Sequence, residues 1–284
     1  GPMTSGGNYG GTNSLGDLDL WSFTANAGDN LVLRLGTTGF DGNLNLYGPN
    51  GALLKTAASG VDAEIEITAT NSGTFTALVS SYTSGGTGTY VLHLARFPGA
   101  FIVPPGDAGG PMTNAGNYAG TISLGGLDLW AFTACIGDPV NLRLSPTNFT
   151  GSLNLYGPNG ALLSTAASST AAIINYTPTN CGTFTVLVSS YASGGTGTYG
   201  LSANGLSDGL KLCRPSIKGT TLTLNGVGGI TNGGFLLFTT TNVAQPADLW
   251  TPILTNRFDQ FGVLTYTNVY SPGLRQQYFR LLER

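Results

Sequence analysis

The residues that could support catalysis are few and do not form a recognisable set. His93 is the one histidine among 284 residues, so a Ser-His-Asp or Cys-His arrangement would have to use it. Its position between Leu92 and Leu94 is typical of an ordinary strand residue, and no GxSxG motif accompanies it. The sequence therefore predicts that the chain is not an enzyme.

Three cysteines offer redox chemistry rather than metal binding. Cys135 and Cys181 replace Asn26 and Ser72, their counterparts in an internal repeat described below. Because these two cysteines appear together on a matched scaffold, we expect them to form a disulfide, which fits an oxidising compartment. Cys213 is then free or paired elsewhere; three separate buried thiols are the alternative. Zinc is disfavoured because the chain has no CxxC motif and no second histidine.

Carboxylates are the remaining candidates for chemistry. Asp17 and Asp19 lie two residues apart, which places them on one face of a strand. With Asp41 they are the candidate ligands of a calcium ion, which takes six to eight oxygens, and no other cofactor is expected. The structural alternative is supported by the repeat: Asp17 corresponds to Gly126, which argues against a pair of catalytic acids, whereas Asp19 corresponds to Asp128.

Exposed aromatic side chains could provide a platform for sugars. Tyr82 and Tyr191 occupy matching positions of the repeat, among Ser, Gly and Thr residues that are expected to form loops. They are the candidate ligand-binding residues for a polysaccharide. Trp21 and Trp130 lie in predicted strands, where tryptophan more often belongs to the core.

The elements that must position these residues come in duplicate. Residues 1 to about 94 and 110 to about 203 align without gaps at a constant offset of 109 residues, as GPMTSGGNYGGTNSLGDLDLWSFTA and GPMTNAGNYAGTISLGGLDLWAFTA illustrate. We place the two domains at residues 1–97 and 110–205. Such a long repeat indicates duplicated domains rather than a solenoid, whose period is about 20 to 50 residues. Because the first residues already align inside the repeat, we expect the chain to be either a processed form or an excerpt of a longer protein.

Short strands separated by glycine, asparagine and proline fill each copy, with no amphipathic helix. For example, LNLY turns through GPNG into a second strand. About seven or eight strands per copy predict an antiparallel β-sandwich or jelly roll. The predicted fold class is therefore all-β, with two tandem sandwiches and a smaller C-terminal β-sandwich of six strands at residues 206–284.

The strand motifs also carry a resemblance. The order GDLDLWSFTANAGDNLVLRLG, LNLYGPNGALL, GTFTALVSS and GTGTYVLHLA resembles the bacterial pre-peptidase C-terminal (PPC) domain, in both copies. The resemblance implies a non-catalytic accessory module of secreted or surface proteins; some members bind carbohydrate, collagen or calcium. The acids that bind calcium there have no clear counterpart here. Residues 206–284, ending in QQYFRLLER, resemble C-terminal β-modules of secreted proteins from Verrucomicrobia and Planctomycetes, which imply no activity.

The connector between the copies, residues 98–109, has the sequence PGAFIVPPGDAG. Its prolines predict a stiff, extended segment. Phe101, Ile102 and Val103 are too apolar to face water, so we expect them to dock on a neighbouring surface. That surface belongs either to one of the two copies or to another molecule, where the three residues would assist assembly.

Charge is sparse and unevenly distributed. Charged residues make up 9% of the chain and hydrophobic residues 41%, a profile that suits a secreted or surface β-protein. Residues 1–97 carry seven acids and three bases, whereas residues 206–284 carry four acids and seven bases. The two ends could attract one another between molecules, with chance variation as the alternative. Nucleic-acid binding is not expected, and no apolar run reaches the roughly 18 residues of a membrane span.

These patterns favour a non-catalytic structural protein at the cell surface or outside the cell. We expect it to self-associate through head-to-tail contacts as the protomer of a fibre or filament. The alternative is the carbohydrate-binding, accessory region of a larger secreted hydrolase.

Overall fold

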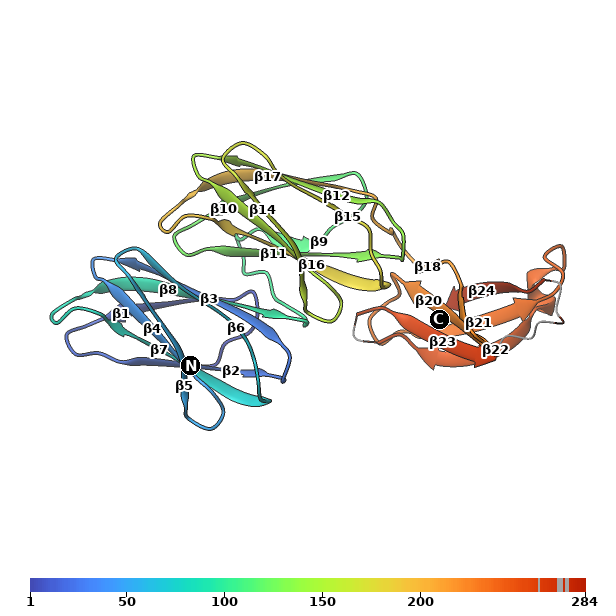
Figure 1. Cartoon of the computed structure of the whole chain (residues 1–284), viewed down its shortest axis with the longest axis horizontal. Helices are drawn as coiled ribbons and strands as arrows, with labels where there is room; N and C mark the ends of the chain where they lie inside the picture. Colours follow the sequence, from blue (N-terminus) through green and yellow to red (C-terminus); the bar gives the residue numbers. More distant parts are fainter. Residues whose placement is uncertain (260, 270–272, 274–275) are drawn as a thin grey trace.

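The structure is a computed structural model that describes residues 1–259, 261–269, 273 and 276–284. It consists of three β-modules in a row along the chain (Figure 1). One turn of 3-10 helix, Ala247–Leu249, is the only helical element in the described part. The predicted all-β fold is confirmed, and antiparallel pairing dominates. Among the described residues, no helix has the length and apolar character needed to cross a membrane.

Module 1 is a sandwich of two four-stranded sheets, ordered β1-β8-β3-β6 and β2-β7-β4-β5. Alternation along the strands decides which side chains enter the core: Leu31, Leu33 and Leu35 of β3 point inward, while Val32 and Arg34 point outward. The strands are β1 (Asn8–Asn13), β2 (Asp19–Ala25), β3 (Asn30–Thr38), β4 (Gly42–Tyr47), β5 (Leu53–Ser59), β6 (Asp62–Thr68), β7 (Gly73–Ser81) and β8 (Gly88–Phe97).

Module 2 repeats this topology, with sheets ordered β10-β17-β12-β15 and β14-β13-β16-β11-β9. The extra edge strand β9 pairs in parallel with β11; in module 1 the corresponding contact is a single parallel bridge between Pro2 and Ser22. The strands are β9 (Gly109–Pro111), β10 (Gly116–Ile122), β11 (Leu127–Ala134), β12 (Val140–Thr147), β13 (Gly151–Tyr156), β14 (Leu162–Ser168), β15 (Ala172–Tyr176), β16 (Gly182–Ser190) and β17 (Gly197–Asn204).

The C-terminal module contains two smaller sheets, β18-β20-β19 with β23 on β20, and β22-β21-β24. We expected six strands, and seven are found in the described residues. The segment LKLCRPSI divides into two strands because Pro215 has no backbone N–H to donate to the sheet. The strands are β18 (Lys211–Leu212), β19 (Ser216–Lys218), β20 (Thr221–Val227), β21 (Gly234–Thr240), β22 (Thr251–Arg257), β23 (Leu264–Val269) and β24 (Tyr278–Glu283).

The boundary after module 2 lies slightly later than the predicted start at residue 206. Leu206 is buried in the core of module 2. The Ser207 hydroxyl donates to Asp138 (2.6 Å), and Asp208 accepts from the backbone N–H of Asn114 (2.7 Å). These residues therefore complete module 2, and the C-terminal module begins with β18.

Modules 1 and 2 lie side by side, and the C-terminal module follows at the far end of module 2 (Figure 1). Each of the first two modules has its own apolar core. A separate cluster of buried apolar side chains, drawn from both modules, lies between them. The two sandwiches therefore pack through their outer faces rather than through their loops alone.

Candidate functional site

The most extensive candidate site is the interface between modules 1 and 2. Side chains on the outer face of β3 and β8 in module 1 meet the outer face of β11, β13 and β16 in module 2. The ring of Phe97 stacks on that of Tyr156, with centroids 3.7 Å apart and planes 4° apart. The buried apolar members of this interface are Val32, Ala95, Phe97, Leu127, Leu129, Tyr156 and Leu187.

A buried ion pair occupies the polar part of this interface. Arg34 is 1% exposed, and its Nη2 donates to Asp62 Oδ2 at 2.7 Å. Its Nη1 donates to the backbone carbonyl of Ser190 in module 2 at 2.9 Å. Asp62 also accepts from the backbone N–H of Gly194 at 3.1 Å. Both residues therefore connect the modules, since Asp62 also accepts from the Ser193 hydroxyl through its backbone carbonyl at 3.2 Å.

The backbones of the two modules also touch directly. A Cβ added to Gly36 in β3 would overlap the carbonyl oxygen of Leu124, in the loop before β11. Gly125 approaches the backbone of Gly36 in the same way. Only glycine at position 36 permits this approach, since any side chain would displace the loop.

His93 lies on the same outer face as Arg34, which it faces across the ladder. It is 2% exposed, and neither ring nitrogen has a hydrogen-bond partner in the described part of the chain. Burial lowers the pKa of His93 to about 4; the nearby Asp107 carboxylate opposes this shift and the Arg34 guanidinium adds to it. His93 is therefore neutral near pH 7, as an interior residue rather than an acid–base group.

The connector docks within the chain, on module 1 and on the interface. Phe101 packs against the interface cluster, and the backbone N–H of Ile102 donates to the Ser5 carbonyl at 2.9 Å. Asp107 accepts from Asn8 Nδ2 at 2.9 Å. Of the three apolar residues, Phe101 is half-buried, whereas Ile102 and Val103 remain exposed. The expected docking is thus intramolecular for Phe101.

The candidate calcium ligands are not brought together. Asp17 accepts hydrogen bonds from the backbone N–H groups of Ser14 and Leu18, and Asp19 accepts from the Tyr90 hydroxyl at 2.6 Å. Asp41 lies apart, after β3. Among the described residues, the one group of three metal-capable side chains consists of cysteines, and these aspartates form no such group.

The counterpart of Asp19 in module 2 is more deeply buried. Asp128 is 2% exposed and accepts from the Tyr199 hydroxyl at 2.6 Å, which in turn accepts from Trp130 Nε1 at 3.1 Å. Burial raises the pKa of Asp128 to about 7; the hydrogen bond from Tyr199 opposes the shift and the nearby Asp107 adds to it. Tyr199 thus joins β17 of one sheet to Asp128 and Trp130 of β11 in the other, and the Asp107 carboxylate of the connector lies near Asp128.

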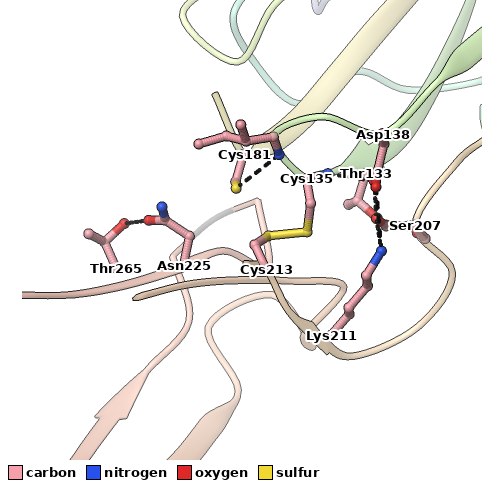
Figure 2. The surroundings of a disulfide bond; sticks show 10 residues. Thr133, Cys135, Asp138, Cys181, Ser207, Lys211, Cys213, Asn225 and Thr265 are labelled. Carbon is pink, nitrogen blue, oxygen red and sulfur yellow. Dashed lines mark hydrogen bonds and ion pairs between the residues drawn. A yellow bond between two sulfur atoms is a disulfide. The ribbon is translucent and has the colours of Figure 1, made fainter. Parts of the chain in front are cut away.

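The predicted Cys135–Cys181 disulfide is wrong. Cys135 is bonded to Cys213 of the C-terminal module, and Cys181 is a free thiol beside that bond (Figure 2). The predicted proximity of Cys135 and Cys181 is confirmed, since all three sulfur atoms lie within 4.8 Å of one another. It could not reveal the third sulfur, because Cys213 lies outside the repeat.

Polar contacts join the same two modules around the disulfide. Asp138 accepts from Ser207 and lies 3.6 Å from Lys211 Nζ (Figure 2). The Thr183 hydroxyl donates to the Phe261 carbonyl at 3.0 Å. The C-terminal module is therefore tied to module 2 by one covalent bond and a few hydrogen bonds, a smaller contact than the one between modules 1 and 2.

The two candidate ligand-binding tyrosines are both exposed, Tyr82 by 68% and Tyr191 by 70%. Each lies in a loop, as the sequence predicted: Tyr82 directly follows β7, and Tyr191 directly follows β16. Tyr191 lines a depression of about 470 Å³ at the module boundary, together with Lys55, Glu66 and Asn154. Tyr82 lines a separate surface depression beside Asp41. Two isolated rings on different modules do not make a shared stacking platform.

Comparison with known proteins finds a family model that matches part of module 1. Residues 17–81 match the family model of the bacterial pre-peptidase C-terminal domain. No curated protein matches the chain. Among solved structures, tripeptidyl peptidase 2 (TPP II) is similar at 11% identity with a TM-score of 0.24; the match covers 93% of this chain. The chain spans 25% of that structure's length.

Proposed function

We propose that the chain is a non-catalytic, extracellular structural protein, a protomer of a surface fibre or similar assembly built by contacts between sandwich modules. The observation that carries this proposal is the interface between modules 1 and 2. There, part of one outer face of each sandwich is covered by the neighbouring module, with apolar side chains, a stacked aromatic pair and a buried ion pair. Faces of this kind are suited to building an array.

The side chains that could do chemistry support a non-catalytic role. His93 is buried and neutral near pH 7, and two of the three cysteines form a disulfide. Asp19 and Asp128 each accept a hydrogen bond from a tyrosine of their own module. The match of residues 17–81 to the pre-peptidase C-terminal domain is consistent with an accessory module outside the cell.

Electron microscopy of the protein isolated from its native source tests this proposal. We expect ordered filaments or arrays in which immunogold labelling places this chain along the whole length. A monodisperse, unattached protein at every concentration, with no labelled assembly from the native source, would overturn it. The acidic first module and the basic C-terminal module predict that high salt weakens any contact between those ends.

Carbohydrate binding within a larger secreted hydrolase is the second candidate. It is favoured by the exposure of Tyr82 and Tyr191, because tyrosine rings that face water can stack on sugars. Retention of the chain on insoluble polysaccharides, compared with the Tyr82→Ala and Tyr191→Ala variants, tests it. Retention lost in the variants would support this function, and no retention on a broad panel of glycans would rule against it.

A further inference from the structure

The second sheet of module 1 presents an apolar outer face to solvent. Leu18 and Leu20 are 62% and 59% exposed. Their counterparts at the offset of 109 residues, Leu127 and Leu129, are 4% and 3% exposed, because module 1 covers them. Tyr47 and Leu78 belong to the same face, and their counterparts Tyr156 and Leu187 are identical in type and buried. We define the leucine face as Leu18, Leu20, Tyr47 and Leu78.

The covered counterpart shows what such a face accepts. In module 2 it receives Val32, Ala95 and Phe97 from β3 and β8 of module 1. Phe97 stacks on Tyr156, which is the counterpart of Tyr47. The loop before β11, at Leu124, contacts the backbone of Gly36, where there is no side chain to prevent the approach. A partner of the leucine face therefore needs apolar side chains, an aromatic ring and a glycine in this arrangement.

Module 2 does not offer that arrangement on its own free sheet. The positions of Val32 and Ala95 hold Asn141 and Asn204, and the position of Gly36 holds Ser145. In the same docking geometry, the Cβ of Ser145 would overlap the loop carbonyl that corresponds to Leu124, as a Cβ on Gly36 would. The asparagine side chains would also lose water without a matched partner. A second copy of this chain therefore does not supply the missing face.

We propose that the leucine face is the docking surface for a further β-sandwich module with a face like that of β3 and β8. This partner carries glycine at the position of Gly36, small or branched apolar residues at the positions of Val32 and Ala95, and an aromatic ring at that of Phe97. It docks on the side of module 1 opposite module 2, so the stack of modules continues. The inference rests on the proposed function and adds to the assembly a contact with a module that a second copy of this chain does not supply.

A gain of assembly in the full chain tests this inference. The triple variant Asn141→Val, Ser145→Gly, Asn204→Ala gives module 2 the glycine and the two apolar residues of the partner face. Leu206, at the position of Phe97, is left unchanged because it belongs to the core of module 2. Module 1 of one molecule should then dock on module 2 of the next, and the contact does not close on itself. We expect the weight-average mass in analytical ultracentrifugation to rise with concentration well above that of the unmodified chain.

Two controls make the contact specific. The double variant Asn141→Val, Asn204→Ala keeps Ser145 and should remain at the unmodified mass, since the Cβ blocks the loop. Adding Leu18→Asp and Leu20→Asp to the triple variant should reverse assembly. A triple variant that does not associate, or that associates regardless of Ser145 or of the two leucines, overturns the inference.

A second measurement does not depend on the triple variant. The Leu129→Asp chain should release module 2 from module 1 and so uncover the β3–β8 face. We expect it to form a complex with the unmodified chain. It should form none with a chain that carries Leu18→Asp and Leu20→Asp. Absence of a complex with the unmodified chain counts against the inference. These solution experiments are distinct from the search for native filaments, so the docking surface and the proposed function can fail separately.

The three sulfur atoms at the C-terminal junction support a second, independent inference. Cys181 is partly exposed beside the Cys135–Cys213 bond, and its Sγ accepts from the backbone N–H of Ile136 at 3.4 Å. In module 1, Ser72 Oγ accepts from the corresponding N–H of Ala27 at 2.9 Å. The turn that carries Cys181 therefore already holds its side chain next to Cys135.

We infer that Cys135 exchanges its partner between Cys213 and Cys181. The Cys181 thiolate attacks Cys135 Sγ, a Cys135–Cys181 bond forms, and the Cys135–Cys213 bond breaks with its electron pair leaving on Cys213. The Cys213 thiolate takes up the proton that Cys181 released, so no oxidant or reductant is consumed. The exchange removes the covalent tie to the C-terminal module while one disulfide is kept within module 2.

Peptide mapping of the intact chain tests the exchange. Trypsin cuts after Arg143 and Lys211, which places the three cysteines on different peptides. Because burial raises the pKa of the Cys181 thiol, we expect Cys135–Cys181 peptides to accumulate faster near pH 9 than near pH 5. In Cys181→Ser only the Cys135–Cys213 linkage should appear. Prolonged incubation near pH 9 that yields only that linkage in the unmodified chain overturns the inference.

Discussion

Modules 1 and 2 have the same strands in the same order, yet they use opposite outer faces. Module 1 buries the outer face of its β1-β8-β3-β6 sheet, and module 2 buries that of the sheet containing β11, β13 and β16. The same residue can therefore have different surroundings: Leu20 is exposed, and its counterpart Leu129 is buried. The exposure of a residue therefore depends on the neighbouring module. Positions where the copies differ, such as Val32 against Asn141 and Gly36 against Ser145, decide which faces meet.

The largest expected difference between the copies concerns one arginine. Arg34→Ala leaves the Asp62 carboxylate buried without its cation, and we expect the free energy of unfolding to fall by about 3 to 5 kcal/mol. The matched variant Arg143→Ala changes an exposed side chain and should cost less than about 0.5 kcal/mol. Urea denaturation of both variants measures this. Equal losses would contradict the role of the interface in burying Arg34.

The acid in module 2 predicts one pH trend. The pKa of Asp128 in the folded chain, about 7, lies above its ordinary value of 3.8, so the unfolded chain releases this proton first. The unmodified chain therefore loses stability from this group as the pH rises from about 4 to about 7. Asp128→Asn should remove a penalty of about 4 kcal/mol above pH 7. Unfolding curves at several pH values measure it; a gain independent of pH would contradict the assignment.

The histidine in module 1 predicts the opposite trend. The pKa of His93 in the folded chain, about 4, lies below its ordinary value of 6.5. Above pH 6.5 the residue is neutral in both the folded and the unfolded chain, so its protonation does not lower the free energy of unfolding there. The contribution of His93 to the free energy of unfolding falls as the pH drops from about 6.5 to about 4, by about 3 kcal/mol in total. His93→Ser, which installs the residue found at position 202, should abolish this loss. In this variant the remaining dependence from Asp128 should make stability fall as the pH rises between about 4 and 7.

The smallest expected effect comes from a single added methyl group. Gly36→Ala places a Cβ against the Leu124 carbonyl and should cost about 1 to 3 kcal/mol through displacement of module 2. Hydrogen exchange should show lower protection in β11, while the core of module 1 keeps its protection. Ser145→Ala, at the counterpart position in module 2, serves as the control and should leave exchange unchanged.

Much of the fold could be predicted from the chain itself. Alternating apolar residues and asparagine-glycine turns identified the strands of both copies, and the repeat indicated two domains of one kind. The exposure of Tyr82 and Tyr191 also agreed with their loop context. The partner of Cys135 was missed because comparison of the copies cannot include a residue that has no counterpart. The alternation of leucines in LVLRLG places Arg34 on the outward side of its strand, yet no local pattern indicates that another module covers it.

The class of fold and the inward or outward direction of strand residues follow from periodicity over a few residues, and the duplication follows from comparing two stretches of the chain, so all three can be predicted without a structure. The burial of an outward face, the partner of Cys135 and the shielding of His93 from water follow instead from the folded arrangement. They depend on contacts between residues far apart in the chain, such as Gly36 with Leu124 and Arg34 with Ser190. No local period encodes these contacts, because each needs the faces of two sandwiches.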